Sequence, residues 1–293
     1  MTRILNDSGR LKLILPEGIL DVANASNGRF SHDPQAIFED WDDFQEWAQS
    51  GSKSADATAP ESARILSPVP RPRQIVGVGL NYHTHIHHSG LKTPTEPGVF
   101  AKFLTSLAGP HADILLPSET VFTEAEAAVV IKREAYFINE DQALDHVAGV
   151  TVAQDLYDRT AIVNIPKLDG SGGATYLNPS KSLATFTPLG PEVVSLEAAG
   201  DLGSLAIELD FNDTAIQRGN TSDLVFAIPE LIARLSRRLR LLPGDVILTG
   251  SPARIEGTEG IALRPGDLIR ASVAGLGTQL QVARPAETAR LAS

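Results

Sequence analysis

Cysteine is absent from this 293-residue sequence, so disulfides, thiolate metal sites and a thiol nucleophile are all excluded. Methionine occurs once and aromatic residues make up only 5% of the chain, but 42% of it is hydrophobic, which is enough to build a full core. Because a chain without cysteine suits a reducing compartment, we expect the protein to be cytoplasmic.

Positive charge and long apolar runs are also scarce. No run approaches the roughly 18 apolar residues of a membrane span, and the first residues, MTRILNDSGRLKLIL, lack the apolar region of a signal peptide. The net charge of -11 opposes binding to nucleic acid or to an anionic membrane. The most basic stretch, residues 234–241, is interpreted as the solvated face of a helix. An anionic substrate must therefore be attracted locally, by a metal ion or a few basic side chains.

Two regions are predicted. Residues 11–22 read as two short strands around a Pro-Glu-Gly turn, and residues 38–47 as a short acidic, aromatic helix. A polar stretch at 49–63 and a proline-rich run follow, which places a boundary near Pro68. We therefore expect a small N-terminal α/β module at 1–68 and a catalytic domain at 69–293.

The larger region is rich in strand patterns separated by glycine, proline and aspartate turns. One clear helix is expected over residues 222–239, where leucine and isoleucine recur at helical spacing and Pro229 lies near its start. Many strands with few helices predict a mainly β fold with some α structure, an α+β arrangement rather than an alternating doubly wound sheet.

Three carboxylates are candidates for a metal site. Glu124 and Glu126 are two residues apart in an apolar segment, so on a strand both side chains project from one face. Asp155 ends the apolar run VAGVTVAQD. An all-oxygen site of this kind favours Mg²⁺ or Mn²⁺, with Ca²⁺ as a further option, over zinc or copper. The alternative is a solvated edge strand with two surface glutamates and a turn aspartate.

Four histidines crowd the segment GLNYHTHIHHSG. If this segment is helical, His85 and His88 lie on one face because they are three residues apart. The cluster could serve catalysis or bind a transition metal, or it could be a solvated loop.

Several motifs in a fixed order resemble the fumarylacetoacetate hydrolase superfamily over residues 72–282. They are Gly79-Leu80-Asn81-Tyr82 with His85, Phe100-Ala101-Lys102, Glu124-x-Glu126, Asp155 with Arg159, Lys181-Ser182, Gln217, Pro243-Gly244-Asp245, and Thr249-Gly250-Ser251-Pro252.

The resemblance implies a distorted, mostly antiparallel β-roll, a homodimer, and a divalent ion held by Glu124, Glu126 and Asp155. By the same resemblance, His85, His88 and Lys181 are catalytic. The substrate-binding residues that it implies are Lys102, Arg159, Gln217, Thr249 and Ser251.

Two departures from the family pattern stand out. His88 occupies the position of the glutamate in the family's His-x-x-Glu pair, and neutral imidazole cannot stabilise a neighbouring imidazolium by opposite charge. A longer connection at 165–179 precedes Lys181 and is expected to shape substrate choice.

The expected activity is metal-dependent hydrolysis of a carbon-carbon bond in a small anionic β-dicarbonyl or acylpyruvate-type 2-oxo acid. The same enolate chemistry would also serve a decarboxylase, an isomerase or a 2-keto-3-deoxy sugar acid dehydratase. A non-catalytic relative that binds a metal and an oxo acid is the remaining alternative.

Overall fold

A computed structural model describes residues 1–51, 53–55, 61, 64–167, 173–176 and 178–286. Within this part of the chain, strands dominate and the helices are few and short. The polar stretch at 49–63 and the connection at 165–179 fall partly outside the described residues. The predicted mixed, mainly β fold is confirmed.

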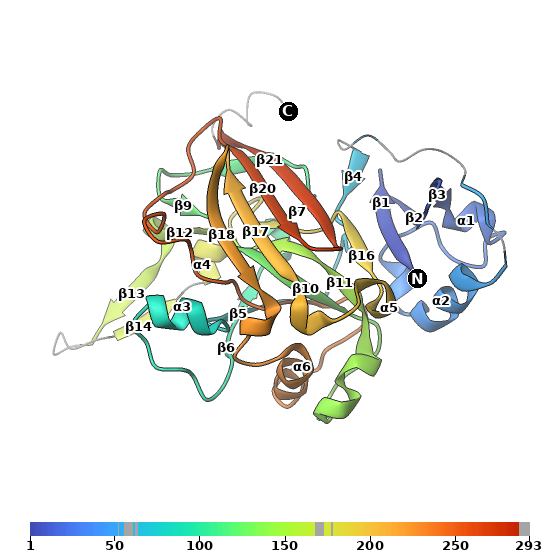
Figure 1. Ribbon diagram of the computed structural model, residues 1–293, viewed down its shortest axis with the longest axis horizontal. Helices are drawn as coiled ribbons and strands as arrows, with labels where there is room; N and C mark the ends of the chain where they lie inside the picture. Colours follow the sequence, from blue (N-terminus) through green and yellow to red (C-terminus); the bar gives the residue numbers. More distant parts are fainter. Residues whose placement is uncertain (52, 56–60, 62–63, 168–172, 177, 287–293) are drawn as a thin grey trace.

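The main sheet has ten strands and runs through the whole molecule (Figure 1). Its order is β3-β2-β1-β16-β11-β10-β19-β5-β6, with β4 also paired to β1. The strands are β1 (Arg3–Asp7), β2 (Arg10–Leu15), β3 (Gly18–Asp21), β4 (Ile65–Leu66), β5 (Ile75–Gly79), β6 (Gly98–Lys102), β10 (Ala125–Ile131), β11 (Val147–Gln154), β16 (Glu192–Val194) and β19 (Val246–Leu248).

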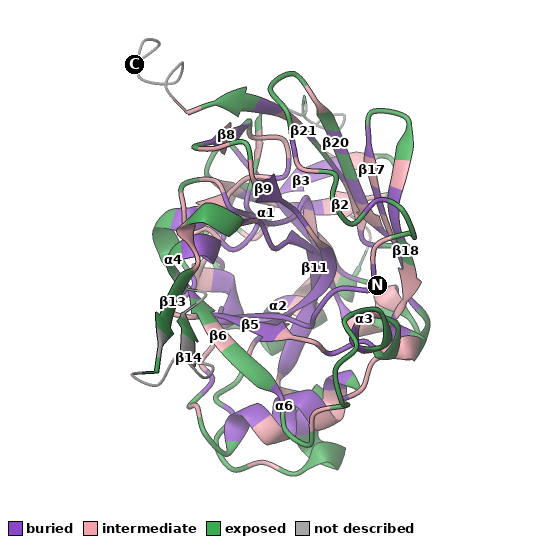
Figure 2. Ribbon diagram, turned by 90° about the vertical axis from the view of Figure 1, so that its left-hand side faces the viewer, coloured by how far each residue is buried: buried purple, intermediate pink, exposed green. Residues whose placement is uncertain are grey.

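A second sheet of five strands packs across the first and gives the molecule its rolled shape. Its order is β18-β17-β20-β21-β8, and in Figure 1 the strands β17, β18, β20 and β21 lie in the upper part of the molecule. Figure 2 shows that the strands are mostly buried, whereas the surrounding helices and connections are partly exposed. The strands are β8 (Ile114–Leu116), β17 (Ala206–Phe211), β18 (Thr214–Asn220), β20 (Leu268–Val273) and β21 (Gly277–Pro285).

The helices and small strand pairs lie around the two sheets. The helices are α1 (Val22–Ala25), α2 (Trp41–Gln49), α3 (His83–His88), α4 (Asn178–Lys181), α5 (Leu196–Ala199) and α6 (Ile228–Ser236). The small pairs join β9 (Val121–Phe122) to β12 (Tyr157–Asp158), β13 (Val163–Pro166) to β14 (Gly173–Tyr176), and β7 (Leu107–Ala108) to β15 (Thr187–Pro188). No helix in the described chain has both the length and the apolar character needed to cross a membrane.

β10 separates two cores because successive side chains of a strand point to opposite faces. Val129 and Ile131 join the core beneath the five-stranded sheet and α6, whereas Ala128 and Val130 join the core beneath the N-terminal strands and α2. All seven residues of β10 are buried. The strand that begins beside the candidate metal ligands is therefore held from both sides.

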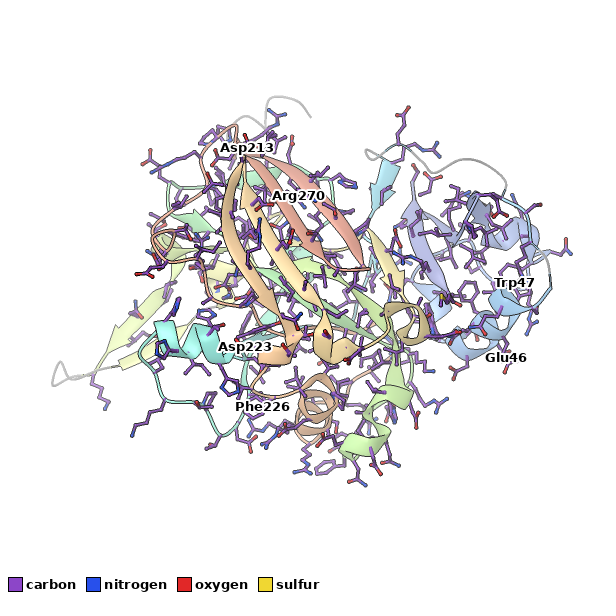
Figure 3. The ribbon with its side chains drawn as sticks, viewed as in Figure 1. Glu46, Trp47, Asp213, Asp223, Phe226 and Arg270 are labelled. Atoms are coloured by element: carbon purple, nitrogen blue, oxygen red, sulfur yellow. The ribbon has the colours of Figure 1, made fainter. Side chains whose placement is uncertain are left out.

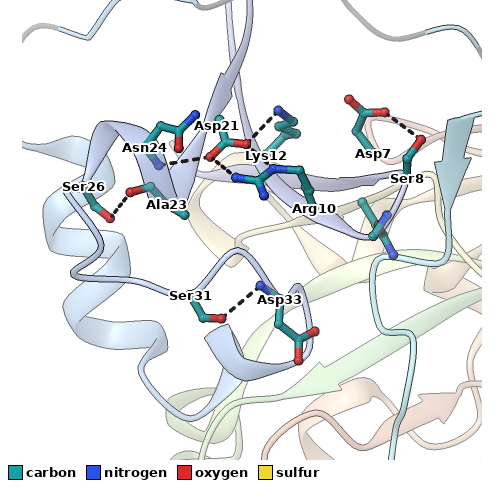
Figure 4. A network of polar contacts seen from close by, with 12 residues as sticks. Asp7, Ser8, Arg10, Lys12, Asp21, Ala23, Asn24, Ser26, Ser31 and Asp33 are labelled. Carbon is teal, nitrogen blue, oxygen red and sulfur yellow. Dashed lines mark hydrogen bonds and ion pairs between the residues drawn. The ribbon is translucent and has the colours of Figure 1, made fainter.

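The N-terminal segment is continuous with the main sheet, because β1 pairs with β16. A polar network links β2 to β3 (Figure 4): Asp21 accepts hydrogen bonds from Arg10 and Lys12, and its carboxylate caps α1 at Asn24. The hydrogen bond from Arg10 holds the pKa of Asp21 well below its usual range. The boundary near Pro68 stays a prediction.

Three buried glutamines connect β21 to β11. Gln154 donates to the side-chain oxygens of Gln279 and Gln281 at 2.8 and 2.7 Å. Gln279 in turn donates to the backbone carbonyls of Val152 and Gly190, both at 3.0 Å. Such a fully paired buried network fixes the position of β11 relative to β21.

The local predictions differ in accuracy. The two strands expected within 11–22 are confirmed as β2 and β3. The helix expected over 222–239 is shorter, running from Ile228 to Ser236, with Pro229 in its first turn. Proline suits the first turn, where its missing N–H costs no hydrogen bond, and residues 221–223 form a separate 3-10 turn.

Candidate active site

Strand register brings the three carboxylates together. In the antiparallel pair of β10 and β11, Ala125 lies opposite Gln154 and Glu126 opposite Ala153. The pairing continues one residue beyond each strand, because the Asp155 N–H donates to the Glu124 carbonyl at 2.9 Å. Glu126, two residues after Glu124, shares its face. This arrangement confirms that the two glutamates do not lie on a solvated edge strand.

The donor set fits a hard divalent cation. One carboxylate oxygen from each of the three residues lies within 4.8 Å of the others. Glu126 and Asp155 are only 2% and 1% exposed, so their charges cannot be screened by water. Clustered, buried carboxylate oxygens are the ligands that Mg²⁺ and Mn²⁺ prefer, and the predicted metal site is geometrically sound.

Two lysines approach the cluster from different elements. Lys102, the last residue of β6, donates to Asp155 and also to the Phe186 carbonyl at 2.8 Å. Lys181, the last residue of α4, donates to Asp155 and lies 3.5 Å from Glu124. Two ammonium groups therefore face three carboxylates, and when all three carboxylates are ionised one negative charge remains for a cation to neutralise.

Aromatic rings flank Lys181. Its Nζ lies 4.7 Å from the ring centroid of Phe100 and 5.1 Å from that of Tyr157. Phe100 can occupy this place because the neighbouring strand carries Gly77, where a Cβ atom would come within 2.2 Å of the ring. The rings hold the ammonium group at the edge of the cluster through cation–π attraction.

The pKa values reflect this crowding of charges. Burial, and then Asp155 and Glu124, raise the pKa of Glu126 well above its usual value. Burial alone would raise the pKa of Asp155, but Lys102 and Lys181 outweigh it and lower that pKa. Burial opposes the charge on Lys181, yet Asp155 and Glu124 raise its pKa. Glu126 is therefore the cluster member that most needs a cation to stay ionised.

A cavity of about 200 Å³ opens directly onto the cluster. Glu124, Glu126, Asp155 and Lys181 line it, and so does His85 of α3. The His85 Nδ1 atom lies 3.2 Å from the Ser251 carbonyl, which can only accept a hydrogen bond. The contact therefore requires the proton on Nδ1 and leaves the Nε2 lone pair available as a base.

The turn after β19 contacts the cluster through a backbone hydrogen bond to Glu126. Gly250 has a φ of 98°, a left-handed conformation suited to glycine, and its N–H donates to Glu126 at 2.7 Å. Asn81, fully buried, donates to the Thr249 carbonyl at 2.8 Å and so ties this turn to the start of α3. The Glu126 carboxylate and the histidine helix are thus held by adjoining segments.

The predicted substrate-binding residues occupy different places. Ser251 lines the first cavity, and Arg159 lines a second cavity together with His85 and His88. Lys102 and Thr249 are fully buried and line neither cavity, and the Thr249 hydroxyl donates to the Ala127 carbonyl.

Gln217 lines the second cavity, but its side-chain amide is occupied. Its oxygen accepts from the Ala125 N–H and its nitrogen donates to the Pro252 carbonyl. In this geometry, Lys102, Thr249 and Gln217 position the site's backbone and Asp155.

Tyr157 and Arg254 are among the cavity residues that were not predicted as site residues. Tyr157 lines both cavities, and its only sequence signal is its place two residues after Asp155. Arg254 lines the second cavity but follows the Thr249-Gly250-Ser251-Pro252 motif without belonging to it. No spacing rule links Arg254 to the carboxylates, because the link arises from the way the chain folds.

Comparison with known proteins identifies the family. The profile for the C-terminal domain of fumarylacetoacetate hydrolase matches residues 74–282. The chain belongs to the fumarylacetoacetate hydrolase family. The superfamily resemblance seen in the sequence is thereby confirmed.

Curated relatives include hydrolases and tautomerases. A 2,4-didehydro-3-deoxy-L-rhamnonate hydrolase of Sphingomonas sp. is 36% identical over 71% of this chain and 72% of its own length. A mitochondrial oxaloacetate tautomerase of Bos taurus is 37% identical over 73% of this chain and 67% of its own length. Membership of the family therefore leaves the reaction open.

Solved structures agree over nearly the whole chain. A Mycobacterium smegmatis protein that carries the name HpcE has a TM-score of 0.85 and 38% identity, covering 97% of this chain and 99% of its own. The maleylpyruvate hydrolase of Sphingobium sp. SYK-6, solved with manganese (II) and pyruvate, has a TM-score of 0.75 and 26% identity, with the same coverage.

Proposed function

We propose that this protein is a divalent-metal-dependent hydrolase that cleaves a carbon-carbon bond in an acylpyruvate-type 2-oxo acid. One observation carries the proposal: the carboxylate cluster, Lys181 and His85 line the same cavity. Hydrolases among the relatives, one of them solved with manganese (II) and pyruvate, support it. Pyruvate is one of the two products that hydrolysis of an acylpyruvate would release.

Glu124, Glu126 and Asp155 would hold Mg²⁺ or Mn²⁺. The bound ion would supply an electrophilic centre that polarises the oxo groups of the substrate and stabilises the negative charge of the departing fragment. The chain's own task is to keep the three carboxylates ionised and aligned. Gly250, through its N–H, holds Glu126, and Lys102 holds Asp155.

His85 is placed to act as the general base. With its proton on Nδ1 and directed at the Ser251 carbonyl, its Nε2 can accept a proton from water. That water attacks the acyl carbonyl, the bond between the acyl and pyruvate fragments breaks, and the proton passes to the carbon released on the pyruvate side. His88 lies on the same helix and can relay that proton.

Lys181 is placed to stabilise the oxyanion formed on the acyl carbonyl. Its ammonium group, flanked by Phe100 and Tyr157, lines the first cavity beside Tyr157 and Glu124, which line both cavities. A fixed cation in a water-poor site stabilises developing negative charge without reorganising.

The runner-up is tautomerisation of a 2-oxo acid. It requires only that a base move a proton between carbon and oxygen, and His85 with His88 suffices for that. The tautomerase among the curated relatives favours this alternative.

The experiment is a substrate panel with product masses. The Mg²⁺- or Mn²⁺-loaded protein is incubated with acylpyruvates, oxaloacetate and 2-keto-3-deoxy sugar acids, with Glu126→Ala as the metal-site control. Addition of water with carbon-carbon cleavage, lost in the control, supports the hydrolase. Loss of carbon dioxide or of water, or isomerisation without a mass change, would replace it with the corresponding alternative.

A homodimer, a cytoplasmic location and the absence of nucleic-acid or membrane partners remain predictions. Light scattering on the purified protein measures the molecular mass in solution, and a monomer mass would contradict the predicted homodimer.

A further inference from the structure

The helix α3 presents its histidines to two different sides. His85 and His88 line the second cavity, which has a volume of about 210 Å³ and is also lined by Glu124. His83 and His87 line neither cavity, and both are exposed. Figure 2 shows α3 as a largely exposed helix. The two outer histidines therefore have no part in the proposed reaction.

His83 and His87 lie one helical turn apart. Side chains at positions i and i+4 of a helix are neighbours, with Cβ atoms about 5–6 Å apart. Imidazole nitrogens bind a divalent transition metal at about 2.0–2.1 Å, so two rings at this spacing can reach the same ion. The sequence has seven histidines, and His83 with His87 is the pair among them with this spacing.

Contacts on its other faces fix the backbone of α3, although the helix is only six residues long. Ile86 is 4% exposed, and Tyr82, the residue before the helix, is fully buried. The Ile86 N–H donates to the Tyr82 carbonyl at 3.0 Å, and Thr84 donates twice to Asp223. Metal binding by the outer histidines would therefore cost mainly side-chain rotamer freedom, and not the ordering of the helix.

Both outer rings are available to a ligand. Neither has a hydrogen-bond or ion-pair partner within the part of the chain that the structure describes. The nearest aromatic neighbour of His87 is His88, with ring centroids 6.1 Å apart. Among the described residues, the group of three possible metal ligands is the carboxylate cluster, so water would complete the coordination shell at the histidines. The net charge of -11 attracts cations to the surface.

We propose that His83 and His87 bind a late transition-metal cation of the class Zn²⁺, Ni²⁺ or Cu²⁺ on the outer face of α3. Imidazole suits these ions, whereas carboxylate oxygens suit Mg²⁺ and Mn²⁺, so the two sites differ in preference. An ion held by both rings stabilises the helical form of α3, because it binds that form more tightly than the separated rings. The site does not depend on the proposed reaction.

The test uses Cu²⁺ as the probe, added to the Mg²⁺-loaded protein. Electron paramagnetic resonance separates the two sites, because imidazole nitrogens split the Cu²⁺ signal and carboxylate oxygens do not. We expect a two-nitrogen pattern in the wild type, and a loss of Cu²⁺ affinity of about tenfold or more in His83→Gln and in His87→Gln. His32→Gln, at an exposed histidine before α2, is the matched control. Glu126→Ala should keep the pattern.

Two results would overturn the inference. One is a nitrogen pattern that survives in His83→Gln and His87→Gln but disappears in His85→Gln or His88→Gln, because the ion would then lie in the second cavity. The other is a Cu²⁺ signal without nitrogen splitting.

Hydrogen exchange tests the stabilisation of α3. With diamagnetic Zn²⁺ at about 100 times its Kd, exchange of the Ile86 and Ser89 amides through local opening of α3 should slow by up to about 100-fold. His87→Gln should lose this protection, which separates it from any effect of Zn²⁺ at the carboxylate cluster. Equal protection in His87→Gln, or none in the wild type, would rule out the stabilisation.

Discussion

At the residue scale, the burial of Glu126 opposes the ionised state that metal binding requires. Its carboxylate is 2% exposed and lies beside two other acids, so in the metal-free protein its raised pKa favours the protonated form. A divalent ion must displace that proton in order to bind. The free energy needed to ionise Glu126 is therefore subtracted from the free energy of metal binding.

Metal affinity is therefore expected to rise with pH, by about tenfold per unit while one proton is displaced. Isothermal titration calorimetry with Mn²⁺ in buffers of different ionisation enthalpy would count the released proton. In Glu126→Gln, whose side chain does not titrate, the residual affinity should lose this dependence. Glu17→Gln, at an exposed turn, should behave as wild type.

Stability without metal should show the opposite trend. A group whose folded pKa is raised stabilises the fold fully below its unfolded pKa of about 4.3, and that contribution is lost as the pH rises through the folded value. With chelator present, the Tm of the wild type should fall relative to that of Glu126→Gln between pH 5 and 9. A constant difference across this range would contradict the raised pKa.

At the scale of elements, α3 carries the proposed base but is only six residues long. A helix this short is not stable alone, so its position depends on tertiary contacts. Asp223 supplies one: its carboxylate accepts from the Thr84 N–H at 3.0 Å and from the Thr84 hydroxyl at 2.6 Å. Figure 3 shows Asp223 beside α3.

We expect Asp223→Ala to lower kcat by about tenfold, because the loss of these charge-assisted bonds lets α3 shift. Metal affinity should not change, since no ligand lies on α3. Asp223→Asn keeps an acceptor oxygen and should restore part of the activity. Asp213→Ala, at the turn between β17 and β18 in Figure 3, is the control. An equal loss in both alanine variants would rule out this role for Asp223.

The sequence predicts the elements that periodicity and turn chemistry specify. β2 and β3 follow from alternation around a Pro-Glu-Gly turn, and the pairing of Glu124 with Asp155 follows the ends of two apolar runs. The extent of α6 was overestimated because Leu224 and Leu239 pack against the same core from outside the helix, so leucine spacing alone does not mark its ends. Arg254 could not be foreseen from the sequence. The fold brings its guanidinium group and that of Arg159 to the same ring, Phe122.

At the scale of the whole molecule, the N-terminal segment is part of the support for the active site. Phe38, Trp41 and Phe44 share a core with Ala128 and Val130 of β10. The same strand carries Glu126. Loss of this packing therefore affects the strand from the face on which the carboxylates lie.

Trp41→Ala should lower the free energy of unfolding by about 3–5 kcal/mol through loss of burial and creation of a cavity. Because β1 pairs with β16, we expect one cooperative transition in which metal binding and secondary structure are lost together. Urea denaturation followed by circular dichroism and metal release checks this. An early transition of the N-terminal module with metal retained would show that the two parts unfold independently.

The glutamine network has a consequence for synthesis. Gln279 and Gln281 lie on β21, the last strand among the described residues, and hold β11, whose end presents Asp155. A nascent chain that still has β21 inside the ribosome cannot form these bonds, so its carboxylates lack their final alignment. We therefore expect a product that terminates before β21 to bind a divalent ion more weakly than the chain that contains this strand.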